Sequence, residues 1–127
     1  MKKVFLPLLF LFFGLTNCIN NVEDNTGEEQ SGISYAQDVQ PIFNDRCVVC
    51  HGASGGVNLS TYAALDNSVG NLYGTDVLVP GNAEASGLYD KLLPTPRLGT
   101  RMPQGGALSG DEIETIRAWI NEGALNN

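Results

Sequence analysis

Two cysteines and a histidine stand together in the string Cys47-Val48-Val49-Cys50-His51. Thiols and an imidazole at this spacing could form part of a zinc site, a redox-active dithiol, a structural disulfide or the attachment site of a c-type haem. In the last case, two thiols on one tight helical turn each form a thioether with an edge of the porphyrin. The imidazole that follows ligates the iron, and neither cysteine does.

Residue counts favour haem attachment over the other three chemistries. The chain has three cysteines and one histidine, too few for four zinc ligands once Cys18 serves another role near the N-terminus. A thioredoxin-like dithiol needs a βαβ context, whereas the flanking segments have helix and loop patterns. A Cys47–Cys50 disulfide would close a very small loop and stabilise little. We therefore predict one haem c, bound covalently by Cys47 and Cys50 and ligated by His51.

The second axial ligand of the iron can be sought among few residues. His51 is the only histidine, and Met1 would be removed with the N-terminal signal, which leaves Met102 as the only methionine. Met102 lies in the segment 99–106, which has no apolar periodicity, although a core methionine more commonly lies on an amphipathic helix. Met102 is the predicted distal ligand. The alternatives are a methionine that fills space in a loop, ligation by Lys91, and an open iron.

A first helix is predicted to lead into the haem motif. Its apolar residues recur at helical spacing: Val39, Ile42, Phe43 and Cys47. Asp38 is the predicted N-cap. Pro41 is compatible with this helix because it falls in the first turn, where no intrahelical donor is missing.

Two shorter helices are predicted in the middle of the chain. The segment 59–65 has the pattern of a short helix capped by Ser60. The segment 82–93 has the pattern of another, which Asn82 caps and Pro94 ends. Between these helices, the many glycines and prolines indicate long irregular loops.

The last helix has the clearest signals in the sequence. Ser109 and Glu112 form a capping box, and the helix is predicted to end near Glu122 with Gly123 in the C′ position. The residues of its predicted buried face are Ile113, Ile116, Trp119 and Ile120. We expect Trp119 to be part of the core rather than an electron relay.

The N-terminal residues 1–17 have the pattern of an export signal. Two lysines precede the uncharged segment Val4–Leu15, which as a helix would cover about 18 Å of the roughly 30 Å hydrocarbon core. Residues 15–18, Leu-Thr-Asn-Cys, are similar to a bacterial lipobox, which implies cleavage before Cys18 and lipid on that cysteine. An ordinary signal peptide is the alternative. We expect an exported protein anchored to the cell envelope, on the periplasmic side of the inner or outer membrane or at the cell surface.

Composition limits the remaining possibilities. Residues 18–32 are polar and acidic and are expected to form a flexible tether, followed by one small domain over 33–127 that we expect to be monomeric. The chain has 7 basic and 14 acidic residues, which is opposite to the charge of a nucleic-acid-binding protein. Hydrophobic residues make up 43% of the chain and the mean hydropathy is -0.05, which excludes a largely disordered chain and a multi-span membrane protein.

Several short strings follow one another in a recognisable order: Asp38–Phe43, Cys47–Gly52, Gly55–Leu59, Val79–Gly81, Arg101–Pro103, Ser109–Ile113 and Ile116–Ile120. This order resembles the class I (mitochondrial-like) monohaem cytochrome c domain of planctomycete-type bacterial cytochrome c lipoproteins. The resemblance implies an all-α fold with long irregular loops, in which the N- and C-terminal helices cross beside a covalently bound haem. It also implies that Val39 and Phe43 pack on Ile116, Trp119 and Ile120.

The same resemblance implies the function. It assigns haem attachment to Cys47 and Cys50, proximal ligation to His51 and distal ligation to Met102. The expected role is that of a membrane-tethered electron carrier, not an enzyme, which cycles between Fe(II) and Fe(III) and has redox proteins as partners. The alternative is a haem enzyme or gas-sensing module with an open sixth iron position. Arg97 and Arg101 are expected either to pair with haem propionates or to be solvated loop charges.

Overall fold

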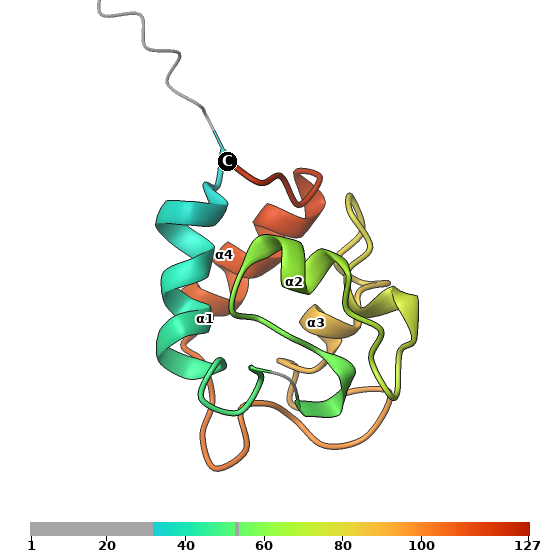
Figure 1. The fold of residues 1–127 in the computed structure, drawn as a ribbon. Coiled ribbons are helices and arrows are strands. Elements are labelled where there is room, and N and C mark those ends of the chain that lie inside the picture. The colour runs from blue at the N-terminus through green and yellow to red at the C-terminus, as the bar shows by residue number, and fades with distance from the viewer. Residues whose placement is uncertain (1–31, 53) are drawn as a thin grey trace, which may run out of the picture.

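The computed structural model describes residues 32–52 and 54–127, which form short helices joined by long loops (Figure 1). No strand occurs within these two ranges, so the expectation of a helical fold is confirmed. None of the helices in the described part of the chain has the length and apolar character needed to cross a membrane. The predicted signal over 1–17, Cys18 and nearly all of the tether lie outside the described residues.

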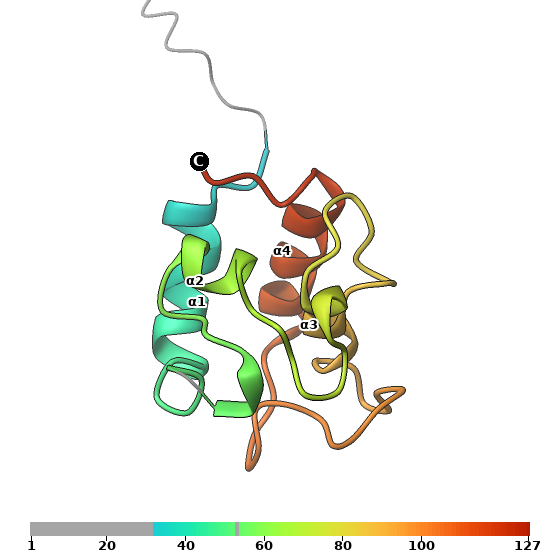
Figure 2. The ribbon, with the colours of Figure 1, turned by 45° about the vertical axis from the view of Figure 1, so that its right-hand side comes forward.

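The helical elements follow the chain in this order: η1 (Tyr35–Val39), α1 (Gln40–Arg46), η2 (Ser54–Gly56), α2 (Tyr62–Asp66), η3 (Thr75–Val77), α3 (Gly87–Asp90) and α4 (Gly110–Asn121). The π-helical turn η1 continues directly into α1, and α4 packs against η1. The loop between α3 and α4, orange in the ribbon, runs along the lower edge of the molecule in both views (Figures 1 and 2).

The first helical segment begins earlier than predicted. Its N-cap is Ser34, whose side chain accepts a hydrogen bond from the amide of Gln37. The prediction that Asp38 caps the helix leading into the motif is wrong, because the Asp38 carboxylate reaches back and accepts from the Ser34 amide at 2.8 Å. Pro41 lies in the first turn of α1, as predicted, because the preceding π turn is a separate element.

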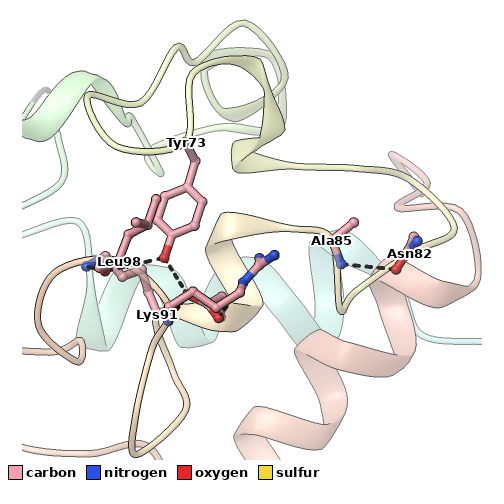
Figure 3. Close-up of polar contacts among 7 residues, drawn as sticks. Tyr73, Asn82, Ala85, Lys91 and Leu98 are labelled. Carbon is pink, nitrogen blue, oxygen red and sulfur yellow. Dashed lines mark hydrogen bonds and ion pairs between the residues drawn. The ribbon is translucent and has the colours of Figure 1, made fainter.

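The two middle helices differ from their predictions. The N-cap of α2 is Thr61, one residue after Ser60, and its hydroxyl accepts from the amide of Ala64. The predicted helix over 82–93 is reduced to the single turn of α3. Asn82 does cap a turn, since its side chain accepts from Ala85 at 3.0 Å (Figure 3).

The fully buried Ser86 explains why the helix over 82–93 does not form. Its hydroxyl donates to the carbonyl of Asn82 at 3.0 Å, the acceptor that an α-helix would give to the Ser86 amide. The Ser86 amide donates instead to Ala83. The same hydroxyl accepts from the amide of Val79 at 2.8 Å. A serine that bonds to nearby backbone in this way competes with the helical ladder.

The last helix follows its prediction closely. Both hydrogen bonds of the Ser109–Glu112 capping box are present, and α4 ends beside Gly123, which has a φ of 105°. The five side chains expected to pack together, Val39, Phe43, Ile116, Trp119 and Ile120, are fully buried in one cluster. The indole of Trp119 donates to the carbonyl of Leu125 at 2.9 Å, so this residue is a satisfied part of the core.

Candidate functional site

A cavity of about 780 Å³ lies between the motif over 47–51 and the loop that carries Met102. Cys47, Cys50, His51 and Met102 all line it. The fold therefore brings Met102 to the same cavity as the motif, although the two are about fifty residues apart in the sequence. Each of the four residues predicted to hold the cofactor lies in the described part of the chain and at this cavity.

The motif itself forms a tight turn at the end of α1. The amide of Cys47 donates to Phe43, and the amide of His51 donates to Cys47 at 2.8 Å. The buried ring of Phe43 anchors this end of the helix in the core. Cys47 and Cys50 thus have the spacing of one helical turn, as the sequence predicted.

The state of the two cysteines bears on the alternative chemistries. Both are free thiols, so they form no disulfide with each other. Burial raises the pKa of the Cys47 thiol to about 11, against the smaller lowering effect of Arg46. Redox-active dithiols need a thiol of lowered pKa, because the thiolate is the reactive form. A neutral thiol at Cys47 is therefore opposite to what a thioredoxin-like site requires.

The imidazole of His51 is fixed by one contact. Its Nδ1 atom lies 3.1 Å from the carbonyl oxygen of Ser54. A carbonyl can only accept, so Nδ1 donates, and in the neutral ring Nε2 is then the nitrogen with a free lone pair that can ligate a metal. Within residues 32–52 and 54–127, no three His, Cys, Asp or Glu side chains come together as a metal site.

Met102 is partly buried and lies on a loop fastened to the end of α3. Its amide donates to the carbonyl of Lys91 at 2.7 Å. The ammonium of Lys91 donates to the carbonyl of Leu98 at 2.7 Å (Figure 3). It also donates to the carbonyl of Thr100 at 2.9 Å. Lys91 is the residue whose amine was an alternative iron ligand on sequence grounds. In the structure this amine is hydrogen-bonded to the two carbonyls.

A buried carboxylate beside this loop was not anticipated from the sequence. Asp90 is only 3% exposed, and both its oxygens lie 2.9 Å from nitrogens of Arg97. The hydroxyl of Tyr73 donates to the same carboxylate. Burial alone would raise the pKa of Asp90, but the hydrogen bonds from Tyr73 and Arg97 outweigh burial and lower it.

The two arginines of this loop have partners within the protein. Arg97 pairs with Asp90, and Arg101 donates from Nε to the carbonyl of Leu92 at 2.8 Å. Neither contact could be read from the sequence, because the pattern of the segment 82–93 predicts one continuous helix. In the structure the helix is shortened to α3, and residues 90–92 contact the loop.

The lining of the cavity fits a haem. Its walls are largely apolar, and they include Val57, Leu59 and Leu88. Two cationic residues, Arg46 and Lys91, also line it, whereas none of the described residues at its surface is Asp or Glu. An apolar ring that carries two carboxylates requires such an environment, because its ring must be shielded from water and its charges need cations.

Neither a protein-family model nor a curated protein matches this sequence. Among solved structures, the chain is similar to Kuenenia stuttgartiensis hydrazine synthase, with a TM-score of 0.52 and 24% sequence identity. The similarity covers 72% of this chain but only 16% of the hydrazine synthase chain. The chain thus shares its fold with a small part of that protein, and the chemistry of the site rests on the residues themselves.

Proposed function

We propose that this protein is an electron carrier of the class I cytochrome c type. One haem c would be attached through Cys47 and Cys50, with His51 as proximal and Met102 as distal iron ligand. The observation that carries the proposal is the single cavity of about 780 Å³ that these four residues share. When bound, the haem would supply one-electron chemistry between Fe(II) and Fe(III).

The roles of the two ligands follow from their surroundings. The Ser54 carbonyl holds the proton of His51 on Nδ1 at 3.1 Å, so the ring presents Nε2 in a fixed orientation. Met102 is held by its own amide at 2.7 Å from the Lys91 carbonyl. Two neutral ligands held by rigid backbone suit electron transfer, because the coordination need not change with oxidation state.

The lining of the cavity sets the expected reduction potential. Its apolar side chains would shield a bound haem from water, and low polarity disfavours the additional charge of Fe(III). The cations Arg46 and Lys91 act in the same direction, since positive charge also favours the reduced state. We therefore expect a positive potential.

The cellular arrangement is part of the same proposal. Residues 1–17 would be removed as a signal peptide, Cys18 would carry lipid, and residues 18–32 would tether the domain over 33–127 to a membrane of the cell envelope. Redox proteins would be the partners. Export agrees with haem attachment, because covalent haem is added outside the cytoplasm in bacteria.

The test is to express the full chain with c-type haem maturation machinery and measure its intact mass and absorption spectrum. We expect one haem that resists acid acetone, cleavage and lipid at Cys18, and the weak near-infrared band of methionine-ligated ferric haem. Met102→Ala should lose that band and keep the covalent haem. Colourless protein after correct export would overturn the proposal. Rapid carbon monoxide binding by the reduced wild type would favour an open-site enzyme or sensor.

A further inference from the structure

Lys91 contacts the Met102 loop from both its backbone and its side chain. Its carbonyl accepts from the Met102 amide at 2.7 Å. Its ammonium donates to the carbonyls of Leu98 and Thr100. It also lies 6.0 Å from the centre of the Tyr73 ring, and Lys91, Leu98 and Tyr73 lie together in Figure 3. The cation is therefore held by two carbonyl acceptors and lies beside an aromatic face, at a partly exposed position.

The loop is shaped to pass close to this ammonium. Gly99 stands between the two carbonyls that Lys91 binds, and its φ is 67°. A Cβ at this position would lie 2.7 Å from the Lys91 Nζ and 2.9 Å from a methyl group of Leu72. The left-handed backbone favours glycine here, and an added Cβ would displace the Lys91 ammonium and the Leu72 methyl group. The two ends of the turn over 98–100 therefore both bind the Lys91 ammonium.

Lys91 is itself held firmly. It is the C-cap of α3, and its amide donates to the carbonyl of Gly87 at 3.0 Å. Its neighbours Asp90 and Leu92 bind Arg97 and Arg101. Three consecutive residues therefore fasten the loop, and Lys91 makes the contacts nearest to Met102.

We propose that Lys91 is a positioning residue for Met102, whose ammonium sets the turn over 98–100 and so holds the thioether at the cavity. This inference rests on the proposed ligand role of Met102. Without the ammonium, the Leu98 and Thr100 carbonyls would turn toward water, and Met102 would leave the iron more often.

The experiment compares three haem-loaded proteins: wild type, Lys91→Met and Arg117→Met. Arg117 is the matched control, because it is also a cation with a long stem but it binds Glu84 and Glu114 on the outer side of α4. Imidazole binds only to iron that Met102 has left, so its apparent affinity rises with that open fraction. We expect Lys91→Met to weaken the near-infrared band and raise imidazole affinity about tenfold, the factor for a lost hydrogen bond to a charged group. Arg117→Met should match wild type.

A second pair of variants keeps the proposal testable if Lys91→Met does not load haem. Gly99→Ala retains the lysine but its added Cβ displaces the ammonium from its place between the two carbonyls, and should also weaken the band. Lys91→Arg keeps a cation and should restore part of it. Wild-type band intensity and imidazole affinity in both Lys91→Met and Gly99→Ala would overturn the positioning role. A wild type that lacks the band, or a Met102→Ala variant that keeps it, would instead overturn the ligand role of Met102.

Discussion

The Nδ1 atom of His51 lies 3.1 Å from the carbonyl oxygen of Ser54, three residues along the chain. Ser54 begins the short helical turn η2, which continues through Gly55 and Gly56. The orientation of the imidazole therefore depends on the backbone of this turn. The amide of Leu59 donates to the His51 carbonyl at 2.9 Å, so the backbone of His51 is also bonded to the end of the loop that follows η2.

Gly56→Ala should disturb this turn and destabilise the protein. Gly56 has a φ of 75°, and a Cβ there would lie 2.2 Å from the carbonyl oxygen of Val69. Gly105→Ala is the matched control, because its φ is 83° but no atom lies within 4 Å of the added Cβ. We expect Gly105→Ala to cost about 1 kcal/mol from the left-handed backbone alone and Gly56→Ala to cost clearly more. Urea denaturation measures both, and equal costs would contradict the steric argument.

Asp90→Asn should destabilise the protein and flatten its response to acid. The carboxylate is 3% exposed and its hydrogen bonds lower its pKa below the ordinary 3.8. A lowered pKa contributes stability that is present above the unfolded value and lost as the pH falls through the folded value. The wild type should therefore lose stability below about pH 4 more steeply than the variant.

The cost of Asp90→Asn at neutral pH should be about 2 kcal/mol, because the change weakens hydrogen bonds from Arg97 and Tyr73 to a buried charge. Because the Arg97 side chain is half-exposed, water screens part of its attraction to Asp90 and limits this stability cost. Asp76→Asn, at an exposed position, is the control and should change little. Unfolding curves at pH 3 to 7 give the measurement. Parallel pH dependences of wild type and Asp90→Asn would contradict the assignment of the acid response to this carboxylate.

Local signals in the sequence were reliable where a few neighbouring residues decide the structure. The capping box of Ser109 and Glu112 fixes the start of α4 by two short-range hydrogen bonds. The spacing of Cys47, Cys50 and His51 fixes a helical turn that needs no distant partner. Met102, which elimination among few candidates singled out, lines the same cavity as Cys47, Cys50 and His51, and its role as iron ligand stays a prediction.

The sequence failed where contacts between distant segments override local preference. The pattern over 82–93 predicts one continuous helix, but Ser86 is buried in the core and its hydroxyl accepts a hydrogen bond from the amide of Val79. That shortening leaves Asp90 facing Arg97 and Lys91 facing Leu98. A buried carboxylate with two partners has no periodic signature in the sequence. The contacts that Asp90, Lys91 and Leu92 make with the Met102 loop could therefore not be predicted.

Tyr35→Phe should make the protein less sensitive to alkali. Burial of Tyr35, with a smaller effect of Tyr62, raises the pKa of the Tyr35 phenol to about 12. The unfolded chain ionises near the ordinary value of about 10, so a stabilising contribution present below pH 10 is lost as the pH rises to 12. The variant should show a shallower decline in that window.

At neutral pH the Tyr35→Phe variant should be about 1 kcal/mol less stable, because it loses the hydrogen bond from the phenol to Gln40. The ring remains packed 5.2 Å from the ring of Trp119, so the core should stay intact. Denaturation at pH 9 and pH 11 separates the two effects. A decline between these values as steep as that of the wild type would show that Tyr35 is not the group responsible.

The Cys47→Ala/Cys50→Ala protein, which cannot attach haem, should be poorly folded. A domain of this size buries only about 60–65% of its unfolded surface, and the apolar walls of the 780 Å³ cavity would face water or collapse without the porphyrin between them. Near-ultraviolet circular dichroism and thermal melting should show weak tertiary signals and no cooperative transition. Cys50→Ala alone is the control, because the thioether at Cys47 should keep the haem in place and preserve a cooperative melt. A sharp, native-like transition in the double variant would mean that the helices around Trp119 are stable without the cofactor.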